Sequence, residues 1–112
     1  MSFLFGPKVD EADVRETAEA VGTGAEEAVL VDVREPHEWR AGHVADARHI
    51  PLNQLPQQLE TLPRGAPVYL ICRSGNRSHT AAAYLKKAGF RRPINVRGGM
   101  IAWERAGLPV ER

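Results

Sequence analysis

The chain contains 112 residues, of which 43% are hydrophobic and 26% charged, and this composition is typical of one soluble globular domain over residues 1–112. Fifteen lysines and arginines against fourteen acids give a net charge of +1, which excludes a strongly basic nucleic-acid-binding protein. The single cysteine excludes an internal disulfide and a zinc–thiolate cluster.

The first predicted element is a helix over Asp10–Val21, with Asp10 as its N-cap and Gly22 at its end. An apolar strand over Ala28–Val33 follows it. Three further elements are expected before the middle of the chain: a short helix over 36–41, a short strand over 48–50, and a helix over 52–62. In the last of these, leucines recur at helical spacing, and Pro56 is tolerable only in a first turn or at a break.

The second half begins with the most apolar strand, Val68–Ile71, which is followed by the polar stretch CRSGNRS. Three elements complete the chain: a helix over 78–88, a strand over 94–96 and a helix over 99–106. Apolar strands that alternate with helices predict an α/β fold whose mostly parallel sheet is covered on both faces. Ligands of such sheets bind beyond the carboxyl ends of the strands, which points to the loops after Ile71 and Val33.

No segment of the sequence predicts a membrane span or a secretion signal. The longest apolar run, Val68–Cys72, is far too short to cross a membrane. The first residues, MSFLFGPKVDEAD, lack the charged start, the long apolar segment and the small-residue cleavage site of a secretion signal. We therefore expect a cytoplasmic protein with no membrane partner and no nucleic-acid partner.

Charge is divided unevenly along the chain. Residues 1–60 carry twelve acids and five bases, whereas residues 61–112 carry ten bases and two acids. No acid lies between Glu60 and Glu104. One interpretation is a local site for a small anion, free of neighbouring carboxylates; a polynucleotide is disfavoured because aromatic residues are not interleaved with the arginines. A solvated basic face is favoured instead for four of the bases, Lys86, Lys87, Arg91 and Arg92.

The loop after the central strand carries the strongest chemical signal. Cys72 ends the strand and is followed by six loop residues: Arg73, Ser74, Gly75, Asn76, Arg77 and Ser78. A glycine in such a tight loop permits a positive φ, so successive backbone N–H groups can point inward as an anion nest. With the dipole of the following helix, this nest stabilises a thiolate, the reactive form of cysteine. The two loop arginines are suited to hold an oxyanion substrate.

Other interpretations of this loop are weaker. A lone cysteine at a strand end is most often a small buried hydrophobe, but a core cysteine does not require the polar loop that follows Cys72. Cysteine phosphatases place their loop arginine one position later than Arg77, where this chain has Ser78. The shorter loop suits a sulfur atom better than a phosphoryl group, which disfavours a phosphatase or an arsenate reductase.

The remaining polar and aromatic candidates are given structural roles. The four histidines match no metal-site spacing, so no metal is expected: they are His37, His43, His49 and His79. We expect His43 to make structural hydrogen bonds and His79 to lie in the first turn of a helix. Asp32 and Arg34 form either a buried pair that supports the active-site loop or a purely local turn. The tryptophans and the glycine pair are assigned to packing, with Trp39 and Trp103 in the core and Gly98-Gly99 admitting the last helix close to the cysteine loop.

Four segments together carry a family resemblance: VLVDVREPHEW (29–39), GHVADARHIP (42–51), VYLICRSGNRS (68–78) and VRGGMIAWERAGLPV (96–110). In this order, around a cysteine loop of this length, the chain resembles single-domain rhodaneses, which are thiosulfate sulfurtransferases. The resemblance covers a core of about residues 9–110. One departure is Asp46, where the family usually has a glycine, and it lies outside the cysteine loop.

The resemblance implies a rhodanese-like α/β fold with a roughly five-stranded, mostly parallel sheet flanked by helices on both faces. It implies that Cys72 is the nucleophile and carries sulfur as a covalent persulfide, without another cofactor. Arg73 and Arg77 occupy positions where the family places substrate-binding side chains. Sulfur would pass from thiosulfate to cyanide or a thiol. 3-Mercaptopyruvate is disfavoured as donor because the loop carries two arginines and not a Gly-Ser-Gly-Val type sequence.

The alternative function is a sulfur-relay module that accepts a persulfide from a partner protein and passes it on. In either function the transferred sulfur is bound to the only cysteine of the chain. Because no second cysteine can take it up, this sulfur has to pass to an external acceptor, such as a sulfur-acceptor protein. The oligomeric state is left open, with a monomer as the default expectation.

Overall fold

The computed structural model describes residues 8–112. Residues 1–7 lie outside the described residues, and with them lie the start of the predicted domain and most of the N-terminal segment in which no secretion signal is predicted. Five strands form a single sheet in the order β1-β5-β4-β2-β3, and every pairing between them is parallel. The strands are β1 Asp10–Ala12, β2 Val29–Asp32, β3 Arg48–His49, β4 Pro67–Ile71 and β5 Arg92–Val96. The predicted α/β fold class is therefore confirmed.

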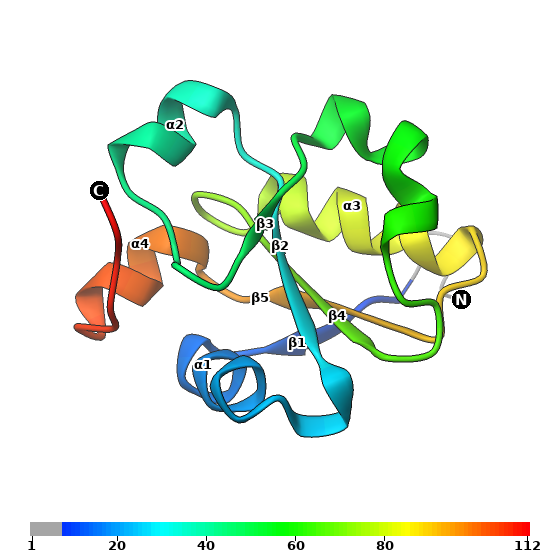
Figure 1. The fold of residues 1–112 in the computed structure, drawn as a ribbon, viewed down its shortest axis with the longest axis horizontal. Coiled ribbons are helices and arrows are strands. Elements are labelled where there is room, and N and C mark those ends of the chain that lie inside the picture. Colours follow the sequence, from blue (N-terminus) through cyan, green and yellow to red (C-terminus); the bar gives the residue numbers. More distant parts are fainter. Residues whose placement is uncertain (1–7) are drawn as a thin grey trace.

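Helices cover both faces of this sheet, as predicted (Figure 1). The helix α1 packs near α4 on one face, and α3 packs with the 3-10 helix η3 on the other. The helical elements are α1 Val14–Thr23, η2 Ala25–Glu27, α2 Pro36–Ala41, η3 Leu52–Thr61, α3 Asn76–Lys87 and α4 Gly99–Arg105. None of the helices in residues 8–112 has the length and apolarity that a membrane span requires.

The two central strands are apolar on both sides because each side meets a layer of helices. Val31 of β2 and Leu70 of β4 point into the core shared with α3 and η3. Leu30 and Ile71, their neighbours in sequence, point into the core shared with α1 and α4. Cys72 belongs to the first of these cores, so the thiol lies on the side of the sheet that α3 covers.

The first predicted helix is wrong at its start. Residues 10–12 form the edge strand β1, which pairs with β5, and Asp13 caps α1 in place of Asp10. The Asp13 carboxylate accepts a hydrogen bond from the Glu16 N–H at 2.8 Å, and the Glu16 carboxylate accepts one from the Asp13 N–H at 3.1 Å. Asp10 is followed three residues later by Asp13, and Asp13 is followed three residues later by Glu16. The local sequence therefore allows either aspartate to cap the helix. Asp13 becomes the cap because residues 10–12 pair with the edge of β5. The helix α1 ends at Thr23, and its C-cap is Gly24, two residues beyond the predicted Gly22.

The helix predicted over 52–62 is present over Leu52–Thr61, but it is a 3-10 helix rather than the expected α-helix. Pro56 lies inside it and has no N–H for an α-helical hydrogen bond. Leu55 and the following Leu62 are the leucines that it buries most deeply. The leucine spacing predicted a helix with one apolar face toward the core, and the 3-10 helix still places leucines there.

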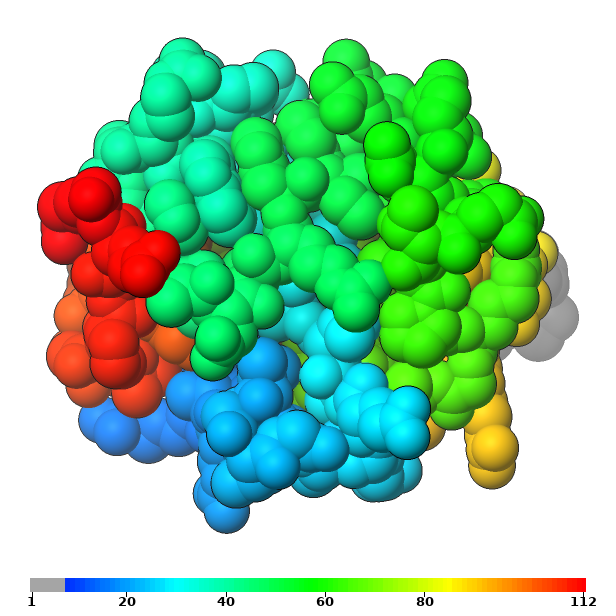
Figure 2. Space-filling view, in the orientation of Figure 1, coloured from blue at the N-terminus to red at the C-terminus, as the bar shows by residue number. Residues whose placement is uncertain are grey.

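The end of the chain is fastened to the segment that follows α2. The backbone N–H of His43 donates to the carbonyl of Glu111 at 2.9 Å, and the N–H of Glu111 donates back at 2.7 Å. This forms an isolated antiparallel bridge. Figure 2 shows the C-terminal residues, in red, on the surface beside that segment. The bridge holds the last residues close to α2 and α4, which flank the site described next.

Candidate active site

The cysteine loop joins the carboxyl end of β4 to the amino end of α3. Cys72 is 1% exposed, and three groups of the loop and of α3 approach its sulfur. The N–H of Gly75 donates to Sγ at 3.2 Å, the N–H of Ser78 donates to it at 3.3 Å, and Ser78 Oγ lies 3.2 Å from it. Gly75 has φ of 113°, a conformation open mainly to glycine. The predicted cradle of inward-pointing N–H groups is therefore present.

These contacts change the acidity of the thiol. Burial opposes ionisation of Cys72, but hydrogen bonds from the Ser78 hydroxyl, the Ser78 amide and the amides of Gly75 and Ser74 outweigh it. The pKa of Cys72 consequently lies below that of an ordinary cysteine. A larger fraction of the thiol is therefore ionised at neutral pH than in a free cysteine.

The helix α4 shapes the outer side of the loop. The N–H of Met100 donates to the carbonyl of Cys72 at 2.8 Å, and the N–H of Ile101 donates to the carbonyl of Arg73 at 3.1 Å. Because the C=O and N–H of a planar trans peptide point in opposite directions, the bond to the Arg73 carbonyl turns the following N–H, that of Ser74, toward the sulfur. The helix comes this close because Gly99 has no side chain: a Cβ there would lie 2.5 Å from both carbonyl oxygens. This confirms the predicted use of the glycine pair.

Asn95 of β5 is a site residue that the sequence analysis missed. It is buried, and its Oδ1 accepts a hydrogen bond from Ser78 Oγ at 2.6 Å. Its Nδ2 donates to the Glu11 carboxylate at 3.0 Å and to the Gly75 carbonyl at 3.3 Å. A signal was available, since an asparagine within an otherwise apolar strand needs buried polar partners. The identity of those partners depends on the order of the strands.

The two loop arginines have different surroundings. Arg77 forms a bidentate ion pair with Glu38 of α2, with both N–O distances at 2.8 Å. The expectation of an anion site free of neighbouring carboxylates is therefore wrong, because the fold brings an acid from the first half of the chain to this loop. Arg73 is exposed and has no ion-pair partner within residues 8–112. Arg73 is thus the loop arginine that is open to a ligand.

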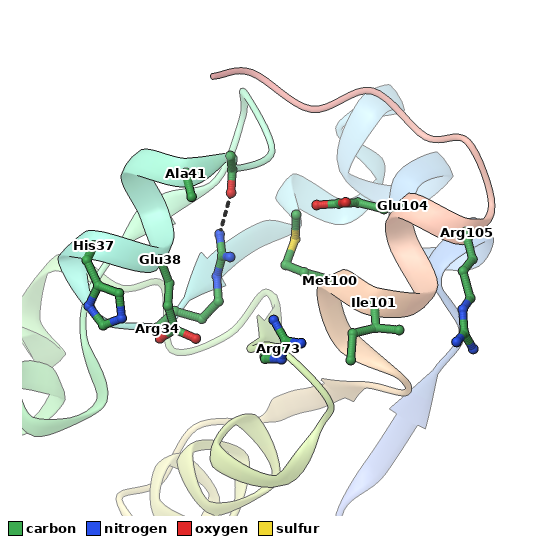
Figure 3. Close-up of a pocket in the computed structure, with 10 residues that line it drawn as sticks. Arg34, His37, Glu38, Ala41, Arg73, Met100, Ile101, Glu104 and Arg105 are labelled. Atoms are coloured by element: carbon green, nitrogen blue, oxygen red, sulfur yellow. Dashed lines mark hydrogen bonds between the residues drawn. The ribbon is translucent and has the colours of Figure 1, made fainter.

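A cavity of about 600 Å³ lies between α2, the cysteine loop and α4. Figure 3 shows Arg73 between side chains of the two helices. Its wall includes the apolar side chains of Met100 and Ile101 and five charged residues: Arg34, Glu38, Arg73, Glu104 and Arg105. The cavity thus combines three arginines and two glutamates with an apolar side on α4, and it is lined by Arg73, the neighbour in sequence of the nearly buried Cys72.

A family model described as a rhodanese-like domain matches residues 13–106. The chain belongs to the rhodanese-like family. It is 44% identical over 85 residues to a sulfurtransferase of Allochromatium vinosum, covering 76% of this chain and 79% of that protein. It is 40% identical over 86 residues to the thiosulfate sulfurtransferase GlpE of Pseudomonas putida, covering 77% of each. The crystal structure of a rhodanese-related protein from Thermoplasma volcanium matches 91% of this chain and 97% of its own, with a TM-score of 0.81 and 29% identity.

Asp32 and Arg34 form a buried pair in this rhodanese-like domain, with Arg34 Nη2 at 2.8 Å from Asp32 Oδ2. The same Nη2 donates to the carbonyl of Gly42 at 2.8 Å. These contacts connect the turn after β2 to the end of α2. They fit the second of the two predicted roles, in which Asp32 and Arg34 stabilise their own turn.

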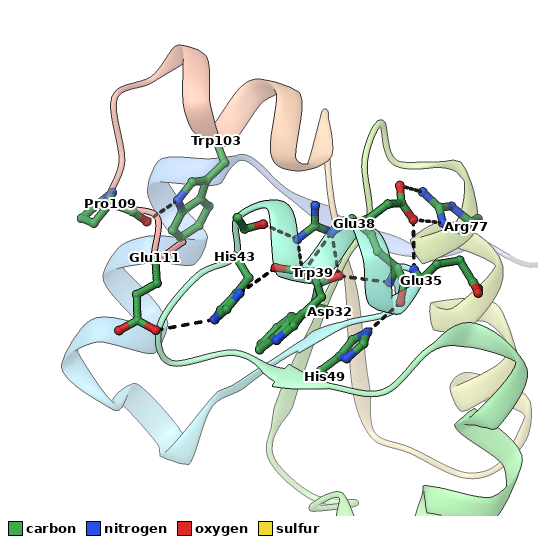
Figure 4. Close-up of polar contacts among 12 residues, drawn as sticks. Asp32, Glu35, Glu38, Trp39, His43, His49, Arg77, Trp103, Pro109 and Glu111 are labelled. Carbon is green, nitrogen blue, oxygen red and sulfur yellow. Dashed lines mark hydrogen bonds and ion pairs between the residues drawn. The ribbon is translucent and has the colours of Figure 1, made fainter.

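Two histidines of the rhodanese-like domain, His43 and His49, make structural hydrogen bonds to backbone carbonyls (Figure 4). His43 Nδ1 lies 2.8 Å from the Trp39 carbonyl, which confirms its predicted role. The Trp39 ring is stacked between the rings of His43 and His49, with centroid distances of 3.7 and 4.7 Å. Trp103 is buried and its Nε1 donates to the Pro109 carbonyl at 3.0 Å. No group of three metal-ligating side chains occurs in the described part of the chain.

The pair of Arg77 and Glu38 predicts a pH-dependent contribution to stability. The Arg77 hydrogen bonds lower the pKa of Glu38 from 4.5 to about 2. A carboxyl with a lowered pKa stabilises the fold above its unfolded pKa, and this stabilisation is lost as the pH falls from about 4.5 to about 2. Because Arg77 is 35% exposed, we expect a loss of only about 1–2 kcal/mol.

This contribution can be measured as the free energy of unfolding in urea across that pH range. Arg77→Gln should flatten the acid dependence. The matched control is Arg92→Gln, since Arg92 pairs with Glu26 at 3.4 Å on an exposed surface and its loss should leave the dependence unchanged. Equal acid dependence in the wild type and Arg77→Gln would contradict the assignment.

Proposed function

We propose that this rhodanese-like chain is a thiosulfate sulfurtransferase whose catalytic nucleophile is Cys72. The observation that carries the proposal is the cradle around the sulfur, in which the N–H groups of Gly75 and Ser78 point at a nearly buried thiol. Donors held in place in this way stabilise an anionic sulfur without reorganisation during the reaction. Support also comes from the relative GlpE, whose name is thiosulfate sulfurtransferase.

The proposed reaction has two half-reactions. The Cys72 thiolate attacks the outer sulfur of thiosulfate, the sulfur–sulfur bond of thiosulfate breaks, and its electron pair leaves with sulfite. Cys72 then carries the transferred sulfur as a persulfide. In the second step cyanide or a thiolate attacks that outer sulfur and releases the Cys72 thiolate again. Atoms and electrons balance without an added oxidant, and ping-pong kinetics are expected.

The experiment that tests this proposal measures the intact mass of the protein. Incubation with thiosulfate should add the mass of one sulfur atom, and cyanide should then remove it. Absence of this gain would overturn thiosulfate as the donor. The cytoplasmic location and the monomeric state remain predictions.

A second candidate is a persulfide carrier that receives sulfur from a partner protein. The observation that favours it is the cavity of about 600 Å³, which is much larger than a small anion needs, with Met100 and Ile101 on its apolar side. Loading by a persulfide-bearing donor protein, compared with loading by thiosulfate, separates the two. Faster loading by the protein donor favours the carrier.

Arg73 is proposed to bind the anionic donor, because it faces the cavity and has no ion-pair partner among residues 8–112. Replacing Arg73 with alanine should raise the KM for thiosulfate roughly tenfold, the effect of losing one hydrogen bond to a charged group. The control is Arg40→Ala, which removes an exposed arginine of α2 outside the cavity wall. Steady-state kinetics that show the same KM for both variants would reject this role.

A further inference from the structure

A chain of polar side chains runs from the Cys72 sulfur to the surface of the molecule. Ser78 Oγ lies 3.2 Å from Sγ and 2.6 Å from Asn95 Oδ1. Asn95 Nδ2 in turn lies 3.0 Å from a carboxylate oxygen of Glu11. Ser78 and Asn95 are buried, whereas Glu11 is exposed on the edge strand β1. A second cavity, of about 180 Å³, is lined by Glu11 and Asn95. The Glu11 end of this row of hydrogen-bonded side chains is therefore in contact with solvent.

The surroundings of Asn95 fix the direction of these hydrogen bonds. The Glu11 carboxylate and the Gly75 carbonyl can only accept, and both lie beside the same nitrogen of Asn95. The amide must therefore present its NH₂ group to them and its oxygen to Ser78. Ser78 has a single hydroxyl proton, and it donates that proton to Asn95.

The single proton of Ser78 matters because Cys72 changes its own hydrogen-bonding character. As a thiol, Cys72 can donate to Ser78 Oγ while Ser78 donates to Asn95, and every group has a partner. As a thiolate, the sulfur can only accept. Ser78 then has one proton for two acceptors, the Cys72 thiolate and Asn95 Oδ1. Whichever of them does not receive the proton is left without that hydrogen bond in the protein interior, which costs free energy.

We propose that Asn95, held in its orientation by Glu11, is a positioning residue that draws the Ser78 proton away from Cys72 and thereby favours the thiol over the thiolate. The amides of Gly75 and Ser78 act in the opposite direction. The Ser78 hydroxyl lowers the pKa of Cys72 because its proton can turn from Asn95 to the thiolate, and the bond to Asn95 opposes that turn. This inference rests on the proposed function only in that Cys72 is taken as the reacting atom.

The test measures thiolate formation on the full chain, in which Cys72 is the only cysteine. The readouts are the pH midpoint of the thiolate ultraviolet absorbance and the rate of alkylation by iodoacetamide at neutral pH. Asn95→Ala should lower the midpoint and speed alkylation roughly three- to tenfold, because Ser78 becomes free to donate to the sulfur. Ser78→Ala should raise the midpoint and slow alkylation by a similar factor. A general loosening of the fold would alter access to the thiol but would not move the two midpoints in opposite directions.

The double variant Ser78→Ala/Asn95→Ala is the decisive control, since Asn95 is proposed to act only through Ser78. Its midpoint should equal that of Ser78→Ala. An unchanged or raised midpoint in Asn95→Ala, or an equal shift by Asn95→Ala in both backgrounds, would overturn the inference. Sulfur loading is not measured in these experiments, so failure of the proposed function and failure of this inference are distinguishable.

Asn95→Leu offers a second variant, in case Asn95→Ala does not fold, because leucine fills a similar volume. Its side chain cannot accept a hydrogen bond from Ser78, so the Ser78 proton is free to turn to the sulfur. We expect a lower midpoint than in the wild type. Loss of this difference in the Ser78→Ala background supports the inference, and its persistence there overturns it.

Discussion

Replacement of Cys72 with serine should abolish the gain of sulfur from thiosulfate and lower turnover on the order of a thousandfold or more, as expected when a covalent nucleophile is removed. A serine hydroxyl is not ionised at neutral pH and cannot form a persulfide. The N–H groups of Gly75 and Ser78 would remain in place around the new oxygen, so only the reacting atom changes. Intact mass before and after thiosulfate measures the loading directly.

The fold of this variant is the necessary control. A serine at position 72 can accept from the same loop amides and can also bond to Ser78, so we expect unfolding free energy to change by only about 1 kcal/mol. Urea unfolding followed by tryptophan fluorescence checks this. The chain has no other cysteine, so a sulfur gain in Cys72→Ser would show that another group carries the sulfur and would contradict the mechanism.

Replacement of Gly99 with alanine should damage stability and activity together. The backbone at Gly99 has φ of 57°, and a Cβ there would lie 2.5 Å from the carbonyl oxygens of Cys72 and Arg73. These atoms are backbone and cannot rotate away, so α4 has to withdraw from the loop. We expect a loss of about 3 kcal/mol or more of unfolding free energy, from the left-handed conformation and the overlap together. Displacement of the cradle should also reduce kcat/KM roughly a hundredfold.

Gly107→Ala is the matched control for this prediction. Gly107 has φ of 73°, but a Cβ there would meet no atom within 4 Å. It should therefore cost only the conformational penalty of about 1–2 kcal/mol and leave sulfur transfer unchanged. Urea unfolding and steady-state kinetics on both variants make the comparison. If the two variants behave alike, the contact between α4 and the cysteine loop does not position the site.

Several features of the site could be predicted from short stretches of sequence. The apolar run before Cys72 and the glycine at position 75 indicate a buried strand that ends in a tight loop, and the structure has both. The glycine pair at the start of α4 indicated a close approach, which Gly99 makes with the cysteine loop. These predictions hold because strand propensity and positive φ depend on residues near one another in the chain.

Other features could not be predicted from local sequence. Glu38 reaches Arg77 across 39 residues, and Glu11 reaches Asn95 across 84 residues. The acidic first half and the basic second half were visible, but the pairing of individual charges between them was not. The edge strand β1 was missed for the same reason, since its hydrogen-bond partner is the distant β5.

The sequence by itself determined the family, the position of the cysteine proposed to react and the length of the loop around it, because these depend on residues that are consecutive in the chain. Only the tertiary structure decided the state of the groups around that cysteine. Sheet order brings Asn95 against Ser78, and α2 carries Glu38 to Arg77, which leaves Arg73 open to the cavity. The physical reason is that hydrogen bonds and ion pairs form between neighbours in space, and the parallel sheet makes neighbours of strands that are far apart in the chain.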